Sequence, residues 1–396
     1  MAAMDRVVVV GGSVAAVNAV DGLRHAGFER EITLVSAEDL LPYDRPPLSK
    51  EALREGRQHE ALLLKEPEWY DEVDVCVSLG TPAVGLDAAA RTVALADGRE
   101  LTYDGLVIAT GSRTRSLPVL AAVPGVFEIR TLADTLGLHA ELTPGRHLVV
   151  IGAGFIGLEV AATACKMGLD VSVVEIAPVP LTRVLGTELG HWFRDHQTDH
   201  GVRMHCGRGI VSVEVTAGGT RLSLDDGTEL LADLIVAGVG VQPATGWLEG
   251  SGVELADGVV CDESLRTSVP GIVAAGDIVR WPNRLFGETM RVEQWLNAVE
   301  QGTHAAKTLM GGAEPFAPVP YFWSDQFEAK VKFVGHVNGD DELKVARTGD
   351  SSLVALFGRG ERLRGALCIN APRQLAFAKR DILQGVTYQD AVAALG

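Results

Sequence analysis

The chain has 396 residues, of which 47% are hydrophobic and 22% charged, a composition typical of a globular protein of about two to three domains. A disordered chain, a collagen and a small disulfide-stapled fold are therefore excluded. The 52 acidic residues outnumber the 35 basic ones and give a net charge of -17, so we expect neither nucleic acid nor a membrane as a partner.

The cysteines and the apolar segments carry no targeting or metal-binding pattern. The five cysteines lie at least 41 residues apart, without a C-x-x-C pair: Cys76, Cys165, Cys206, Cys261 and Cys368. This spacing indicates neither a zinc site nor a redox disulfide, so we expect no metal and free thiols. The uncharged stretch 7–20 near the N-terminus has 14 residues, fewer than the roughly 20 that cross a bilayer. It has no basic lead and contains two glycines, so we expect no signal peptide and a cytoplasmic protein.

The first predicted element, residues 7–38, contains an apolar run, a glycine turn, a helix of small residues and a second apolar run. This order predicts a nucleotide-binding βαβ unit. Ser13 and Ala16 stand where the glycine pattern of such units has its second and third glycines. Both are small enough for close packing, and the Ser13 hydroxyl is suited to bond a phosphate. The predicted nucleotide-binding residues of this turn are Gly11, Gly12, Ser13, Val14, Ala15 and Ala16.

Two strand ends predict a further contact for a flexible polyol. The runs 106–112 and 271–278 each end a predicted strand in small residues, which let another group pass close to the backbone. In the second run, Asp277 lies just beyond the strand end, where a carboxylate is suited to accept a hydroxyl from the ribityl chain of a flavin. An N-cap for the following turn is the alternative interpretation of Asp277.

Residues 147–175 repeat the order of the first unit, with G-x-G-x-x-G at Gly152, Gly154 and Gly157. The first glycine makes the tight turn, the second admits a pyrophosphate, and the third lets the helix pack on the strand. Glu175 ends the next strand, where a carboxylate accepts both hydroxyls of an adenosine ribose. This charge repels a 2′-phosphate, and no basic residue follows before Arg183, so the sequence favours NAD over NADP. A glycine-turned crossover with an incidental glutamate is the alternative.

The ribose contact of the first unit is less clearly defined by spacing. Aligning the two copies at Gly27 and Gly168 places Ser36 opposite Glu175. Glu38 follows two residues later. We choose Glu38 as the ribose contact and keep Ser36 as a candidate.

Seven segments in a fixed order resemble the FAD-dependent NADH:ferredoxin reductases, the group that includes putidaredoxin and rubredoxin reductases. They are GGSVAA (11–16), LPYDRPPLSK (41–50), YDGLVIATGSRTR (103–115), GAGFIGLEVAA (152–162), AGVGVQPAT (237–245), VAAGDI (273–278) and VPYFWSDQF (319–327). The resemblance covers essentially the whole chain, and RPPLSK with FWSDQ is more specific than any glycine pattern. It implies an α/β fold with two Rossmann-like domains, for FAD and NAD, arranged as in glutathione reductase, and a C-terminal α+β interface domain.

The resemblance also assigns residues to the two cofactors. Besides the first turn, Ser36 and Glu38, it implies FAD contacts at Arg45, Lys50, Ala83, Ala109, Thr110, Gly111, Arg130, Gly276, Asp277, Glu293, Gln294 and Trp295. For NAD it implies Gly152, Gly154, Phe155, Ile156, Gly157, Glu159, Glu175, Arg183, Gly238, Val239 and Gly240. The chain departs from the family at two positions. Ser13 is the departure in the first turn. Glu38 is the second, because one well-known member has its acidic residue one position earlier, where this chain has Ala37. Both departures concern the adenosine end of FAD.

The order of these segments predicts three domains. Residues 1–110 and 237–315 are expected to form a discontinuous FAD domain, because the strand before Asp277 must return to the first sheet. Residues 111–236 form the NAD domain, which ends in strands around a hairpin turn at Asp226-Gly227. A similar turn, Asp97-Gly98, lies in the first domain. Short strands near 330–335 and 352–357 and a helix near 371–383 predict the interface domain, 316–396.

Lys50 and Glu159 are the predicted catalytic residues. Lys50 is our candidate for stabilising the negative charge of a reduced flavin, and Glu159 for orienting the nicotinamide and pairing with Lys50. A solvated lysine after a proline-rich turn is the alternative for Lys50. No cysteine precedes Cys76, so the thiol pair of the related disulfide reductases is absent. The electrons are therefore expected to leave singly.

We expect the acceptor to be an acidic two-iron ferredoxin that supplies a monooxygenase or dioxygenase, and the reductase to be a monomer or weak dimer. Residues from Phe316 onward contain 10 basic and 9 acidic residues, against 25 and 43 before, so the excess of acidic charge does not extend to this part. A reductase of rubredoxin or of another acceptor is one alternative. A redox-sensing interaction protein resembling apoptosis-inducing factor is another.

Overall fold

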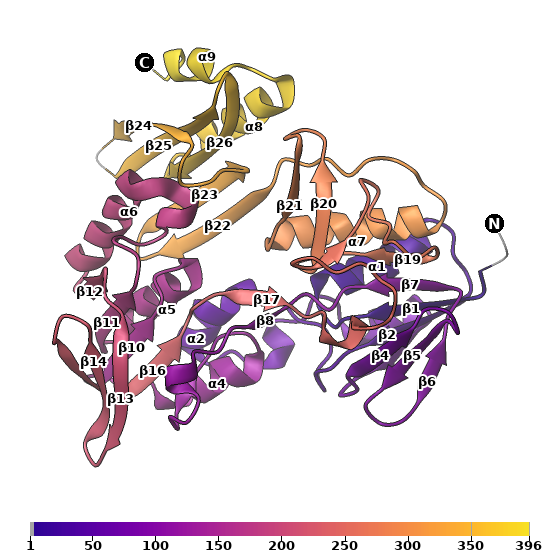
Figure 1. Ribbon diagram of the computed structural model, residues 1–396, viewed down its shortest axis with the longest axis horizontal. Coiled ribbons are helices and arrows are strands. Elements are labelled where there is room, and N and C mark those ends of the chain that lie inside the picture. The colour runs from indigo at the N-terminus through magenta and orange to yellow at the C-terminus, as the bar shows by residue number, and fades with distance from the viewer. Residues whose placement is uncertain (1–3, 350, 396) are drawn as a thin grey trace. The chain divides into compact units, whose positions relative to one another are not determined.

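The computed structural model describes residues 4–349 and 351–395 (Figure 1). The chain divides into two compact units. Unit 1 comprises residues 1–44, 59–113 and 242–321, and unit 2 comprises residues 45–58, 114–241 and 322–396. The predicted fold class is confirmed, because two parallel sheets with helices and a C-terminal α+β region are present.

Unit 1 is built on a five-stranded parallel sheet in the order β19-β7-β1-β2-β3. Its strands are β1 (Arg6–Val10), β2 (Glu31–Val35), β3 (Val75–Ser78), β7 (Gly105–Ile108) and β19 (Ile272–Ala274). Residues 7–10 of β1 are all buried, as expected for a strand of a parallel sheet covered on both faces. Strand β19 pairs with β7, so the third segment of the unit returns to the first sheet.

Helices and small antiparallel sheets complete unit 1. Helix α1 (Val14–His25) packs against α7 (Trp295–Leu309), and α3 (Pro67–Glu72) lies beside β3. One small sheet contains β4 (Ala83–Asp87), β5 (Thr92–Leu95) and β6 (Glu100–Thr102), and the predicted turn Asp97-Gly98 joins its last two strands. The other contains β18 (Val259–Val260), β20 (Val279–Asn283) and β21 (Glu288–Arg291). The chain leaves unit 1 within β8 (Ser112–Thr114) and returns within β17 (Val241–Pro243).

Unit 2 contains the second parallel sheet, in the order β12-β11-β10-β16-β9. Its strands are β9 (Val126–Phe127), β10 (His147–Ile151), β11 (Asp170–Glu175), β12 (Arg203–Cys206) and β16 (Leu234–Ala237). The helices of this region are α2 (Glu51–Glu55), α4 (Leu132–Glu141), α5 (Phe155–Lys166) and α6 (Thr182–Asp199). Thr131 and Asp134 form a capping box that begins α4, which satisfies two backbone donors at the helix end.

The C-terminal part of unit 2 is a five-stranded antiparallel sheet with two helices. Its strands run in the order β22-β23-β26-β25-β24. They are β22 (Tyr321–Gln326), β23 (Ala329–Gly335), β24 (Glu342–Gly349), β25 (Ser352–Arg359) and β26 (Arg362–Ile369), followed by α8 (Pro372–Gln384) and α9 (Tyr388–Ala393). The strands and the helix predicted near 330–335, 352–357 and 371–383 are thus confirmed.

The crossings between the units lie within five residues of the domain boundaries predicted near 110 and 236. The structure groups the C-terminal sheet with the second parallel sheet in one unit, and it also assigns residues 45–58 to that unit. The division into three domains stays a prediction.

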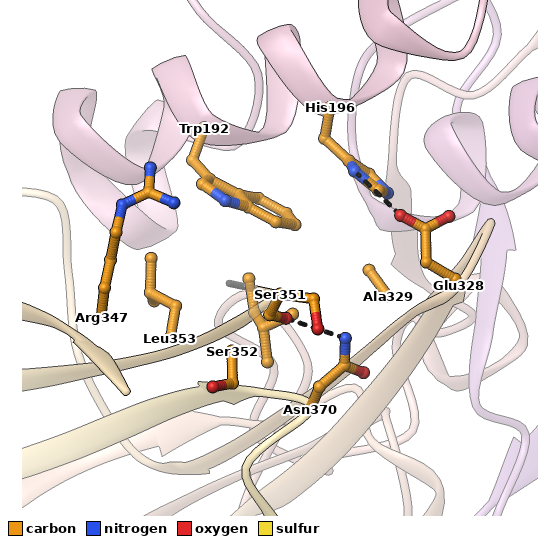
Figure 2. A pocket seen from close by; sticks show the side chains of 10 residues that line it. Trp192, His196, Glu328, Ala329, Arg347, Ser351, Ser352, Leu353 and Asn370 are labelled. Atoms are coloured by element: carbon orange, nitrogen blue, oxygen red, sulfur yellow. Dashed lines mark hydrogen bonds and ion pairs between the residues drawn. The ribbon is translucent and has the colours of Figure 1, made fainter. Parts of the chain in front are cut away.

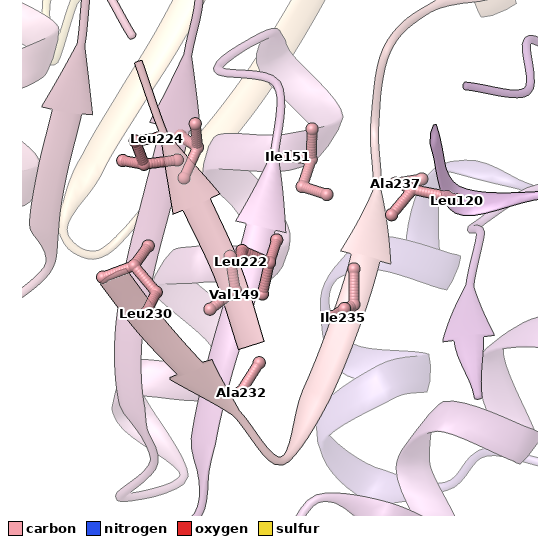
Figure 3. Packing of buried hydrophobic residues seen from close by; sticks show 10 residues of the cluster. Leu120, Val149, Ile151, Leu222, Leu224, Leu230, Ala232, Ile235 and Ala237 are labelled. Atoms are coloured by element: carbon pink, nitrogen blue, oxygen red, sulfur yellow. The ribbon is translucent and has the colours of Figure 1, made fainter. Parts of the chain in front are cut away.

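A hydrophobic cluster joins the second parallel sheet to an antiparallel sheet of β13 (Ile210–Thr216), β14 (Gly219–Leu224) and β15 (Glu229–Ala232). Leu222, Leu224 and Leu230 point from β14 and β15 toward β10 and β16 (Figure 3). Strand β15 alternates between buried and exposed residues, with Leu231 on the outer face, which is the period of a half-buried strand. The predicted hairpin turn at Asp226-Gly227 sets this register.

We predict that Leu222→Ala lowers the free energy of unfolding of unit 2 by about 2–5 kcal/mol, because it leaves a cavity at a fully buried position. Urea unfolding followed by circular dichroism measures this loss. Leu231→Ala is the matched control, since this leucine is 50% exposed on the other face of the same sheet. Its effect should stay within about 0.5 kcal/mol. Equal effects of the two substitutions would contradict the packing in Figure 3.

Candidate functional site: two glycine turns and a buried ion pair

The first glycine turn lies where β1 ends and α1 begins. The Gly11 backbone N–H donates to the Val35 carbonyl at 2.8 Å. The backbone φ of Gly11 is +142°, a conformation that residues with a side chain rarely adopt. A Cβ on Gly11 would lie 2.2 Å from the Ala109 carbonyl oxygen, and a Cβ on Gly12 would lie 2.1 Å from Ser36 Oγ. The turn is therefore packed between the carboxyl ends of β7 and β2, and it brings Ala109 and Ser36 together with the predicted glycines.

The register of the sheets confirms the alignment of the two copies. Val10 lies beside Val35 in unit 1, and Ile151 lies beside Val174 in unit 2. Ser36 and Glu175 are thus the residues that follow in equivalent positions. Glu38 is half-buried, and its Oε2 accepts a hydrogen bond from the Tyr43 hydroxyl at 2.5 Å. Sequence reasoning did not single out Tyr43, although it lies in the segment 41–50 that carries the family resemblance.

Asp277 lies just beyond β19, as predicted, and its Oδ2 accepts from Ser112 Oγ at 3.0 Å. The preceding residue, Gly276, donates its backbone N–H to the fully buried Gln301 at 2.8 Å. Trp295 begins α7 and donates from its indole Nε1 to Asp44 Oδ1 at 2.6 Å. The structure therefore holds Asp277 and Trp295 in place through partners that no motif identified.

The other residues predicted for FAD occupy both units. Thr110 Oγ1 donates to the Ala244 carbonyl at 3.1 Å in unit 1, where the predicted residues Ala83, Gly111 and Glu293 also lie. In unit 2, the Arg45 guanidinium donates to the Arg130 carbonyl.

The second glycine turn, in unit 2, follows the full pattern. The Gly152 backbone N–H donates to the Val174 carbonyl at 2.8 Å, as Gly11 does to Val35. A Cβ on Gly152 would lie 2.4 Å from the Gly238 carbonyl oxygen, and one on Gly157 would lie 2.1 Å from the Gly152 carbonyl oxygen. Gly154 is the N-cap of α5 and has open space around it. The first-turn amides of α5 are thus not capped by a side chain, and they are free to face an anion.

Glu175 has a structural role in addition to its predicted one. Its Oε2 accepts from the Ala153 backbone N–H and its Oε1 from the Ala177 backbone N–H, both at 2.7 Å. Each carboxylate oxygen has a second lone pair, so both can still accept a ribose hydroxyl. Val239 and Gly240 lie partly or fully exposed near the same strand ends, and Arg183 is exposed at the start of α6.

The predicted pairing of Lys50 with Glu159 is present in unit 2. Lys50 Nζ lies 2.8 Å from Glu159 Oε2 and donates to the Pro46 carbonyl at 3.0 Å. Glu159 is only 4% exposed, and it also accepts from Ser49 Oγ at 2.5 Å and from Ser324 Oγ at 2.6 Å. A buried carboxylate requires such donors, because an unpaired charge is costly to bury. Sequence reasoning did not single out Ser49 or Ser324, although both lie in the two most specific segments.

The cysteines are all free thiols, including those in both parallel sheets. Burial, with a smaller contribution from Glu175, raises the pKa of Cys206 to about 11. Burial also raises the pKa of Cys368 to about 12 and the pKa of Cys261 above its ordinary value. These thiols are therefore protonated near neutral pH and are poor nucleophiles. Among the described residues, no helix has the length and apolarity needed to traverse a bilayer.

The residues at both turns fit dinucleotides. Each turn lets a ligand approach the backbone at a helix N-terminus, beside the carboxyl ends of parallel strands. In the part of the chain that the structure describes, the buried Oε1 of Gln294, next to Trp295, has no hydrogen-bond partner, as expected beside a ligand. Fold and site together define a dinucleotide-binding oxidoreductase.

Comparisons with known proteins agree with this class. The pyridine nucleotide-disulphide oxidoreductase family matches residues 5–302, and the reductase C-terminal family matches residues 321–394. Rhodocoxin reductase of Rhodococcus erythropolis is 37% identical over 377 residues, which are 94% of this chain and 88% of that protein. The ferredoxin–NAD(+) reductase subunit of the benzene 1,2-dioxygenase system of Pseudomonas putida is 33% identical over 378 residues, 95% of this chain and 92% of that protein.

A solved structure, the covalent putidaredoxin reductase–putidaredoxin complex, matches with a TM-score of 0.92 and 33% identity over 96% of this chain and 93% of that one. The chain belongs to the pyridine nucleotide-disulphide oxidoreductase family, in the group of reductases that carry the reductase C-terminal domain. Membership of this family implies FAD and a nicotinamide nucleotide as cofactors.

Proposed function

We propose that this protein oxidises NADH through FAD and passes the electrons singly to a two-iron ferredoxin that supplies an oxygenase. The observation that carries the proposal is the similarity, over nearly the whole chain, to reductases named for rhodocoxin, for the ferredoxin of a dioxygenase system and for putidaredoxin. The cysteines support it as well. The part of the chain before Cys76 holds no thiol that could take up the electrons.

Bound FAD would supply the chemistry for taking up a hydride and for releasing the two electrons one at a time. The chain's own residues bind, orient and balance charge around this chemistry. We assign the phosphates of FAD to the turn at 11–16 and those of NADH to the turn at 152–157. Glu159 orients the nicotinamide, and Lys50 supplies the positive charge that a reduced flavin needs. The other residues predicted for the two cofactors are part of this proposal.

The choice of NADH over NADPH rests on Glu175. Its carboxylate is oriented by the amides of Ala153 and Ala177, and its remaining lone pairs suit two ribose hydroxyls. A phosphate in place of the 2′-hydroxyl, as in NADPH, would be repelled by the negative charge of Glu175. Arg183, the next basic residue, is exposed on α6.

Glu175→Ala should reduce the preference for NADH over NADPH by about 10- to 100-fold, because the hydrogen bonds lost are to a charged group. The ratio of kcat/KM for the two nucleotides measures this change. The ratio is insensitive to a general loosening of the turn, which would weaken both nucleotides equally. Glu214→Ala, on an exposed carboxylate of β13, is the control that should leave the ratio unchanged. A preference that survives Glu175→Ala would contradict the assignment.

Lys50→Met should slow the reduction of the flavin by NADH by about 100-fold while leaving most of the FAD bound. Stopped-flow absorbance measures the rate, and the visible spectrum measures the FAD content. Lys50→Arg keeps the charge and should retain a larger share of the rate. A wild-type rate in Lys50→Met would remove Lys50 from the mechanism.

The proposed function is tested by supplying NADH and a panel of acceptors to the FAD-loaded protein. Two-iron ferredoxins should be reduced, and electron flow from them to an oxygenase should follow. Ferricyanide controls for an intact flavin, and rubredoxin tests the alternative acceptor. Reduction of ferricyanide without reduction of any ferredoxin would contradict the proposal.

A further inference from the structure

Three metal-ligating side chains converge in unit 2 away from both glycine turns. His196 lies in α6, His200 is the C-cap of this helix, and Glu328 lies in the turn between β22 and β23. His200 Nε2 is 2.9 Å from Glu328 Oε2, and His196 Nδ1 is 3.9 Å from Glu328 Oε1. One potential ligand atom from each residue lies within 4.8 Å of the other two. The helix supplies the two imidazoles because residues four apart share one helix face.

The outer nitrogen of each imidazole is engaged by a backbone carbonyl. His196 Nε2 lies 3.2 Å from the Gln326 carbonyl oxygen, and His200 Nδ1 lies 2.8 Å from the His196 carbonyl oxygen. A carbonyl only accepts, so each of these nitrogens must carry the hydrogen. In the neutral rings, the remaining nitrogens then turn lone pairs toward the Glu328 carboxylate, which also only accepts. A metal cation between the three groups would satisfy all of these acceptors, and this arrangement is the one that metal-binding histidines adopt.

Stacking holds the two rings in place. Trp192 stacks on His196 with ring centroids 4.8 Å apart, and Phe327 stacks on His200 at 4.0 Å.

A cavity of about 180 Å³ adjoins the cluster. His196 and Glu328 form part of its wall, and Arg347, Ser351 and Asn370 line it as well (Figure 2). The cavity has room for water, and its polar lining can hydrogen-bond a water molecule or a small anion. A ligand from solvent can therefore reach the cluster.

We propose that His196, His200 and Glu328 bind one divalent transition-metal ion of the zinc class, with a water molecule or small anion from the cavity as the fourth ligand. Two imidazoles and a carboxylate suit such an ion and not magnesium or calcium, which prefer oxygen ligands. Zinc ligands at about 2.0–2.2 Å in a tetrahedron lie about 3.3 Å apart. The distances of 2.9 and 3.9 Å to Glu328 bracket this value. The ion links the C-terminal end of α6 to the β22–β23 turn.

Isothermal titration of the FAD-loaded protein with zinc chloride tests this site. The protein must carry no polyhistidine tag and must first be freed of metal with a chelator. The wild type should bind one zinc ion, and His200→Ala and Glu328→Gln should each weaken this binding at least about tenfold. His191→Ala is the matched control, since His191 is exposed on the same helix outside the cluster and should bind zinc as the wild type does.

Two further measurements keep the test independent of misfolding and of catalysis. Glu328 has a side chain that is 63% exposed, so Glu328→Gln should fold and retain its FAD spectrum. Zinc should raise the thermal unfolding midpoint of the wild type and of His191→Ala but not of Glu328→Gln. X-ray absorption should show two imidazole nitrogens and oxygen ligands. No stoichiometric binding in the wild type, unchanged binding in both cluster variants, or sulfur ligands would overturn the proposal.

Discussion

Two close backbone contacts determine where each βαβ unit offers its ligand site. Gly11 packs against the Ala109 carbonyl and Gly152 against the Gly238 carbonyl, at distances that leave no room for a Cβ. These contacts hold the turn between the carboxyl ends of neighbouring parallel strands, so the first amides of the next helix face the same crevice. Ser36 and Glu175 reach the turns only because the strands that carry them share this edge.

The buried carboxylate of Glu159 provides a second constraint, this one within unit 2. Ser49 and Lys50 reach it from the segment 45–58, and Ser324 reaches it from β22. Further hydrogen bonds tie the same segment to the unit, from Thr135 to the Leu48 carbonyl and from Thr163 to the Ser49 carbonyl. A charge that is hidden from water must keep its donors, so these segments are held together. This explains why residues 45–58 leave the unit that surrounds them in sequence.

Many of the site residues could be predicted before the structure, but most of their hydrogen-bond partners could not. The pairing of Lys50 with Glu159 was expected from the family resemblance, and the equivalence of Ser36 and Glu175 followed from the spacing of the two copies. The contacts of Tyr43 with Glu38, Asp44 with Trp295 and Ser112 with Asp277 were not predicted, because the segments that contain these residues do not say which distant side chain each one meets. The cluster of His196, His200 and Glu328 was missed for the same reason. Its cysteine-free composition matches no zinc spacing pattern, and its third member is 128 residues from His200.

The sequence alone indicated the family, through its ordered segments, and showed that no thiol pair precedes Cys76. It also determined the periodic and local features, which are the two βαβ units and the hairpin turns. These depend on residues a few positions apart, whose side chains meet through the geometry of helix, strand and turn. The tertiary structure decided which distant groups form hydrogen bonds with the buried carboxylate of Glu159 and with residues just beyond the strand ends, such as Asp277. It also decided that residues 45–58 belong to the unit that contains the second parallel sheet, and that the acidic side chain of Glu328 meets two histidines. Such contacts arise from packing between elements far apart in the chain, and no local pattern encodes them.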